Sequence, residues 1–89
     1  MRRDRLSKAR EDRDLSQKDV AKILVIAEST VRSLENGLRD PSSKTAAKFA
    51  FLYNTRVDIL FPDIFLLKDD TKRIIKVNLK NIQRKGVAQ

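Results

Sequence analysis

The chain has 89 residues, enough for one small domain, and its 20 Lys and Arg against 12 Asp and Glu give a formal charge of +8. It contains no Cys and no His, which excludes disulfides, Cys/His zinc sites and thiolate or histidine-assisted nucleophiles. No apolar run is long enough for a membrane span or a secretory signal, so we expect a cytoplasmic protein with an anionic partner.

The positive charge is concentrated toward the C-terminus. Residues 71–89 contain six basic residues and no acidic residue, so residues 1–70 carry 14 basic and 12 acidic side chains, a net of only +2. Such a segment is either a solvated tail or an arm that contacts phosphate or a partner chain, and the sequence leaves both readings open.

Two short helices are predicted near the N-terminus. The first spans residues 4–13, with Leu6 on its inner face. Ser16 is followed three residues later by Asp19, which is a variant of the capping box and predicts the start of a second helix. That helix ends near Leu24.

Three further helices follow. The third spans residues 28–35 and is stopped by Asn36-Gly37, because both residue types tolerate the left-handed conformation. The fourth begins at Pro41-Ser42 and ends at Asn54, and a fifth covers residues 57–61. Five short helices predict a compact all-α fold.

Only residues 25–27 connect the second and third helices. Two helices joined so closely cannot lie antiparallel, so they cross steeply and the second presents its outer face to a ligand, as in a helix-turn-helix. The residues that define this arrangement are Ser16-Gln17, Val20-Ala21, Ile26, Ser29-Thr30-Val31, Leu34-Glu35-Asn36-Gly37 and Pro41.

This pattern resembles the Cro/C1-type helix-turn-helix family, the xenobiotic-response-element-like regulators that include phage repressors, over about residues 3–62. The resemblance implies a transcriptional repressor that binds a near-palindromic double-stranded DNA operator as a homodimer, with helix 28–35 in the major groove. It implies neither a cofactor nor a metal, and we expect no enzymatic activity.

The resemblance also implies roles for individual residues. The residues expected to contact the DNA backbone flank the two helices and are Gln17, Asn36 and Arg39. The expected base-reading residues lie at the start and on the outer face of the third helix and are Ala27, Glu28, Ser29, Arg32 and Ser33. Backbone N–H groups at a helix N-terminus favour phosphate, Glu can accept from cytosine, and Arg can donate two hydrogen bonds to guanine.

A structural ion pair between the first and third helices is implied in the same way, between Arg10 and Glu35. If the two charges are partly buried, removing one partner leaves the other uncompensated. The alternative is two unrelated surface charges.

Two residues depart from the family pattern. Val25 stands in the turn where Gly is common, so the turn is either shaped differently or strained. Ala27 stands where Ser or Thr usually caps the recognition helix, which forgoes about 1 kcal/mol, and Ser29 or Thr30 is then an alternative cap for a shorter helix.

The sequence divides into a helix-turn-helix domain over residues 1–63 and a basic extension over residues 64–89. In the extension, alternation of Ile75, Val77 and Leu79 with polar residues favours a strand, although helical spacing is also satisfied. We expect residues 64–82 to form a dimer contact, and the alternative is that the apolar run packs on the helical core. The expected contact residues are Ile64, Phe65, Leu66, Leu67, Ile75, Val77 and Leu79.

A second class of function remains open. The apolar run at residues 64–67 and the weakly charged helical body also suit an antitoxin-like or anti-repressor-binding module, whose main partner is a protein. Recovery of a stoichiometric protein partner would favour this reading, whereas discrimination between operator and random DNA favours the regulator.

Overall fold

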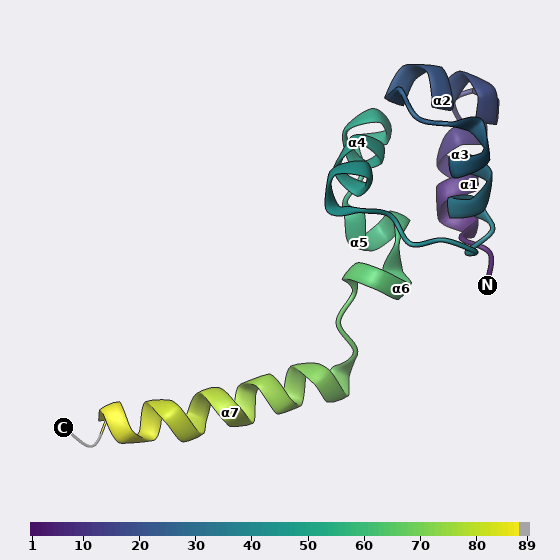
Figure 1. The fold of residues 1–89 in the computed structure, drawn as a ribbon. Coiled ribbons are helices and arrows are strands. Elements are labelled where there is room, and N and C mark those ends of the chain that lie inside the picture. The colour runs from purple at the N-terminus through teal and green to yellow at the C-terminus, as the bar shows by residue number, and fades with distance from the viewer. Residues whose placement is uncertain (88–89) are drawn as a thin grey trace.

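The computed structural model describes residues 1–87, and within that range the chain forms seven helices and no strand (Figure 1). The helices are α1 (Asp4–Glu11), α2 (Gln17–Leu24), α3 (Glu28–Glu35), α4 (Ser43–Tyr53), α5 (Val57–Leu60), α6 (Pro62–Phe65) and α7 (Asp69–Val87). The all-α prediction is confirmed, and the first five helices lie where the sequence predicts them, with ends shifted by at most two residues.

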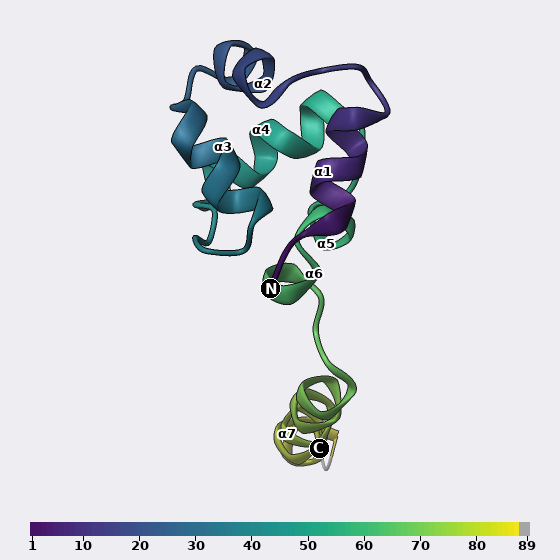
Figure 2. The ribbon, with the colours of Figure 1, turned by 90° about the vertical axis from the view of Figure 1, so that its right-hand side faces the viewer.

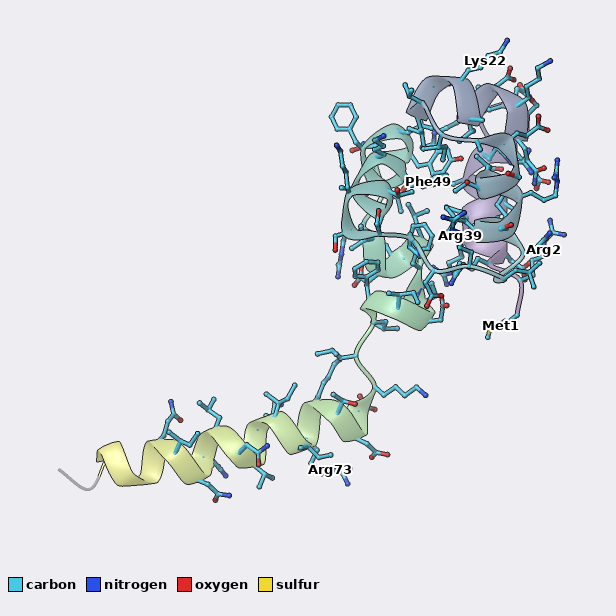
Figure 3. All side chains as sticks on the ribbon, in the orientation of Figure 1. Met1, Arg2, Lys22, Arg39, Phe49 and Arg73 are labelled. Atoms are coloured by element: carbon cyan, nitrogen blue, oxygen red, sulfur yellow. The ribbon has the colours of Figure 1, made fainter. Side chains whose placement is uncertain are left out.

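One apolar core holds α1 to α6 together. Leu6, Val20, Val31 and Leu34 are fully buried in it, together with a group of aromatic side chains centred on Phe49. Figure 3 shows Phe49 inside the helical body. Its ring centroid lies 5.9 Å from those of both Tyr53 and Phe61, distances typical of tilted and edge-to-face aromatic pairs.

Side-chain caps fix the starts of two helices. The Ser16 hydroxyl accepts the N–H of Asp19 at 3.0 Å, and the Asp19 carboxylate accepts the N–H of Ser16 at 2.9 Å, so the predicted capping box is confirmed. The hydrogen bonds that Ser16 donates to the Asp19 carboxylate hold the pKa of Asp19 below its ordinary value. The largest contribution comes from the backbone N–H of Ser16. Ser42 caps α4 by accepting the N–H of Thr45 at 3.1 Å.

The two predicted Asn stops behave differently. Asn54 ends α4 in the left-handed conformation, as the sequence predicts, with φ 49°. Asn36 stays right-handed with φ −81°, and Gly37 alone takes the positive φ, 73°. A Cβ on Gly37 would lie 1.6 Å from the carbonyl oxygen of Met1, so the close approach of the N-terminal residue also requires glycine there.

The prediction of a strand at residues 75–79 is wrong, because these residues lie within α7. β-branched residues prefer strands only weakly, and a strand needs a hydrogen-bonding neighbour that residues 1–87 do not supply. A helix satisfies its own backbone groups, and it places Ile75, Leu79 and Ile82 on one face at positions i, i+4 and i+7.

Helix α7 stands away from the helical body. Figures 1 and 2 show it projecting beyond α6, from which the short segment of residues 66–68 separates it. The elongated dimensions of 58 × 23 × 20 Å reflect this projection. Although α7 has 19 residues, no helix among the described residues combines the length and apolarity needed to cross a membrane.

The described residues cover only part of the basic extension. Of residues 64–89, residues 88 and 89 lie outside the described part of the chain, and side chains are described only up to residue 83. Of the expected dimer residues, Phe65 packs against the core with its ring centroid 6.4 Å from that of Phe61, whereas Ile64, Leu66 and Leu67 are exposed.

Candidate nucleic-acid interface

The α2–α3 unit has a three-residue turn. Helix α2 ends at Leu24, Val25 adopts the left-handed conformation, and the N–H of Ile26 donates to the carbonyl of Ala21 at 3.0 Å. The half-buried Ile26 side chain packs against the core, and α3 starts at Glu28. The turn therefore changes the direction of the chain sharply and fixes α3 relative to α2.

Val25 is strained, as one of the two sequence interpretations holds. Its φ of 58° and ψ of 52° bring the branched side chain close to its own backbone, a conformation that costs about 1–2 kcal/mol for an L-residue. Its side chain is 83% exposed, so burial in this chain does not offset the strain.

Replacing Val25 with Gly is expected to raise the free energy of unfolding by about 0.5–1 kcal/mol, because glycine removes the strain but adds freedom to the unfolded chain. Urea unfolding followed by circular dichroism would measure the change. Lys22→Gly is the matched control, because Lys22 is exposed inside right-handed α2 and should lose about 1 kcal/mol. Equal losses in both variants would show that the turn is not strained.

The outer face of α3 is polar and accessible. Ala27, Glu28, Ser29 and Arg32 are exposed and Ser33 is half-buried, while the opposite face buries apolar side chains in the core. Ala27 is the residue before the helix and gives no side-chain cap, and the alternative start at Ser29 or Thr30 is wrong because α3 already begins at Glu28. The five predicted base-reading residues therefore share one accessible surface.

Glu28 is paired within this surface. A terminal nitrogen of the Arg32 guanidinium lies 3.5 Å from a Glu28 carboxylate oxygen, one helical turn away, and both side chains are about half exposed. An exposed pair of this kind contributes only about 0.3–0.5 kcal/mol, so either side chain can exchange its partner for a base at little cost. The pairing also reduces the repulsion between Glu28 and phosphate.

The start of α2 offers backbone donors. Among the described residues, the N–H groups of Gln17 and Lys18 have no hydrogen-bond partner, as is usual in the first turn of a helix. The side-chain amide of Gln17 points the other way and donates to Glu35 at 3.0 Å. A phosphate at this helix end would therefore meet the backbone N–H groups, with the Gln17 side chain bracing α3 from behind.

The segment after α3 contributes a further cation. Arg39 is exposed, and one of its terminal nitrogens lies 3.4 Å from the hydroxyl oxygen of Thr30, which places its guanidinium beside α3 (Figure 3). Asn36 is also exposed, directly after the last residue of α3. The predicted backbone contacts thus lie at both ends of the helix pair.

A buried carboxylate supports α3 from the inside. Glu35 is 1% exposed, and its carboxylate accepts two hydrogen bonds from Arg10, at 2.7 and 3.1 Å. It also accepts from the Ser7 hydroxyl at 3.3 Å and from Gln17, so α1 and α2 both hold the last residue of α3. Hydrogen bonds with Glu35 raise the pKa of Arg10 above its ordinary value. The structure therefore brings Arg10 and Glu35 together as a two-point ion pair.

A second buried cation, Arg3, was not predicted. Its guanidinium donates to both carboxylate oxygens of Asp63, at 3.0 and 2.8 Å, and to the Asp40 carboxylate at 3.1 Å. It also donates to the carbonyl oxygens of Leu34 and Arg39, at 2.7 and 2.8 Å. The Arg3 side chain is 3% exposed, so it is not available for contact with phosphate. No sequence spacing links these partners.

The Arg3–Asp63 pair is expected to make stability depend on acid. Hydrogen bonds from Arg3 hold the pKa of Asp63 below its ordinary value of 3.8 in the folded state, so the unfolded chain binds more protons just below that value. The pair's contribution is complete above about pH 4 and is lost as pH falls through the lower folded pKa.

The measurement is the difference in unfolding free energy between the protein and Asp63→Asn as pH is lowered toward about 3. The difference should shrink with acid, because protonation of Asp63 removes its ion pair with Arg3. A difference for Asp63→Asn that stays unchanged with pH would contradict the coupling to Arg3.

Comparisons with known proteins agree with this geometry. The family described as "Helix-turn-helix" matches residues 6–60, which include most of α1 and all of α2 to α5. The chain is also similar to an uncharacterized HTH-type transcriptional regulator from Methanocaldococcus jannaschii, with 37% identity over 57 residues that cover 64% of this chain and 80% of that protein. With a short helix pair joined by a tight turn and a polar, exposed second helix, the chain belongs to the Cro/C1-type helix-turn-helix family of DNA-binding transcriptional regulators.

Proposed function

We propose that the protein is a repressor that binds a palindromic operator as a homodimer, with α3 in the major groove. The observation that carries this proposal is the contrast between the two sides of α3. Its outer face is polar and accessible, and its last residue, Glu35, is clamped by Arg10, Ser7 and Gln17. A rigidly held helix loses little conformational freedom when it enters the groove.

The side chains on α3 suit direct reading of bases. Once it leaves Glu28, Arg32 would donate two hydrogen bonds to a guanine, and Glu28 would then accept one from a cytosine amino group. Ser29 and Ser33 suit several bases. Phosphate contacts come from the α2 N-terminus and from Asn36 and Arg39.

Helix α7 is the proposed dimer contact. Ile75, Leu79 and Ile82 form an apolar stripe whose members are 51%, 51% and 72% exposed, and α7 lies clear of the helical body. Covering this stripe with the same stripe of a second chain removes apolar surface from water. Val77 lies off the stripe. The proposed contact residues of α7 are therefore spaced as on one face of a helix and do not alternate as in a strand.

A selection from random DNA identifies the preferred operator, and variants then separate the proposed roles. Arg32→Ala is expected to weaken operator binding by about 10- to 100-fold and to relax preference at one base pair. Arg39→Ala should weaken binding to all DNA about equally and reduce the slope of log affinity against log salt by about one. Fluorescence anisotropy measures both.

Two results would contradict the proposal. One is a loss of affinity in Arg32→Ala that is equal for operator and random DNA, which would show that Arg32 does not read a base. The other is a transcription assay in which the protein, bound to an operator overlapping a promoter, leaves transcript yield unchanged or raises it.

A further inference from the structure

An apolar groove of about 710 Å³ lies between the C-terminal end of α2 and the outer side of α4. It is distinct from the outer face of α3 and from the stripe on α7. Its walls are formed by Ile23 and Val25 on one side and by Phe51 and Leu52 on the other, with Lys44 and Lys48 beside them.

Three large apolar side chains in this groove face solvent. Phe51 is 91% exposed, Val25 is 83% exposed and Ile23 is about half exposed. Isolated exposed apolar residues are ordinary on protein surfaces, but several that converge on one concavity mark an interaction surface. None of the three belongs to the core that holds the domain together.

Val25 is the most informative of them. The turn would be less strained with glycine, and the valine side chain gains no burial in this chain. Its methyl groups do line the groove. A ligand that covers Val25 would supply the apolar contact that the isolated chain lacks.

The charge around the groove has one sign. Lys48 spans it by donating to the carbonyl of Leu24 at 3.0 Å, which ties α4 to the end of α2. Lys44 also lines the groove. No acidic residue lines the groove, and no ion pair involves these lysines among the described residues.

We propose that this groove docks an acidic amphipathic helix of a partner protein. The apolar face of such a helix, with anchors at i, i+3, i+4 and i+7, covers Phe51 and Val25, and its carboxylates face Lys44 and Lys48. The stripe of α7 from a second chain is a poorer occupant, because its polar face carries Lys72, Lys76 and Lys80. This docking is independent of dimerisation and operator binding.

The test uses the full chain and a synthetic helical peptide of about 15 residues, with Leu at the four anchor positions and Glu on the polar face. NMR titration should shift amide signals in α2 and α4, and binding should weaken as salt rises. Phe51→Ser is expected to weaken binding at least about tenfold, while Leu38→Ser, at an equally accessible apolar residue outside the groove, leaves it unchanged.

A second variant separates docking from folding. Val25→Gly is expected to stabilise the domain and yet weaken peptide binding, because it removes part of the groove wall. A peptide with Lys in place of Glu should bind at least about tenfold more weakly.

Three outcomes would overturn the proposal. They are no amide shifts in α2 or α4, equal binding of the Glu and Lys peptides, and a loss of self-association in Phe51→Ser that light scattering detects. The last result would assign the groove to a second copy of the chain.

Discussion

Replacing Glu35 with Ala is expected to lower the free energy of unfolding by about 3 kcal/mol, a large share of the 5–15 kcal/mol typical of a folded domain. The reason is that Arg10, whose side chain is 12% exposed, would remain without its partner, and Ser7 and Gln17 would lose their acceptor. Urea unfolding measures the loss.

A double-mutant cycle with Arg10→Met isolates the ion pair. The double variant should lose less stability than the two single variants lose together. The difference, a coupling of about 1.5–3 kcal/mol, arises because removing both charges leaves neither uncompensated. Lys8→Met is the matched control, since Lys8 pairs with exposed Asp12 and should show no coupling with Glu35. Additive losses for Arg10 and Glu35 would contradict the pairing.

Placing a charge on the α7 stripe is expected to have the largest effect on DNA binding. If α7 forms the proposed dimer contact, Leu79→Lys should give a monomer, because the charge would have to be buried against the partner's stripe. Operator affinity should then fall by about 10²–10⁴-fold, since the two half-sites are no longer bound by linked domains. Sedimentation and anisotropy report the two changes separately.

Asn81→Lys is the matched control for this variant. Asn81 is exposed and lies two residues after Leu79, on the side of α7 away from the stripe, so the same added charge stays in water. Because both substitutions add a positive charge, neither weakens binding through a lost phosphate contact. A Leu79→Lys protein that remains dimeric, or one that is monomeric with full operator affinity, would contradict the proposed role of α7.

The helix-turn-helix could be predicted because its signals are local. A Ser16–Asp19 cap, an apolar residue at Val31 and Leu34, and a Gly at the end of α3 each act within one or two helical turns. Interactions over such short distances along the chain can be predicted from the spacing of residue types. The predicted left-handed Asn36 failed only because the neighbouring glycine takes that conformation at lower energy.

The contacts of Arg3 could not be predicted in the same way. Its partners Asp40 and Asp63 lie 37 and 60 residues away, and they meet it only after every intervening helix has packed. The cation also sits 5.5 Å from the centre of the Phe61 ring, a contact that depends on the same packing. The burial of this N-terminal arginine therefore depends on the whole fold and not on its neighbours in the sequence.

The conformation of α7 was ambiguous for a different reason. The same residues satisfy a period of two and a period of about 3.6, and β-branching tipped the interpretation toward a strand. What decides between them is the absence of a pairing strand in the described part of the chain, which is a property of the whole fold and not of the segment.

The separation of α7 from the helical body has a consequence for how operators are found in a genome. Three residues, 66–68, span at most about 10 Å, so in the proposed dimer each helix-turn-helix would be tethered closely to the α7 contact without being fused to it. Two domains attached in this way would accommodate half-sites whose centres differ by a base pair or so. A search for target promoters should therefore allow the spacer between inverted repeats to vary in length. It should identify operators by the sequences of the two repeats and not by the distance between them.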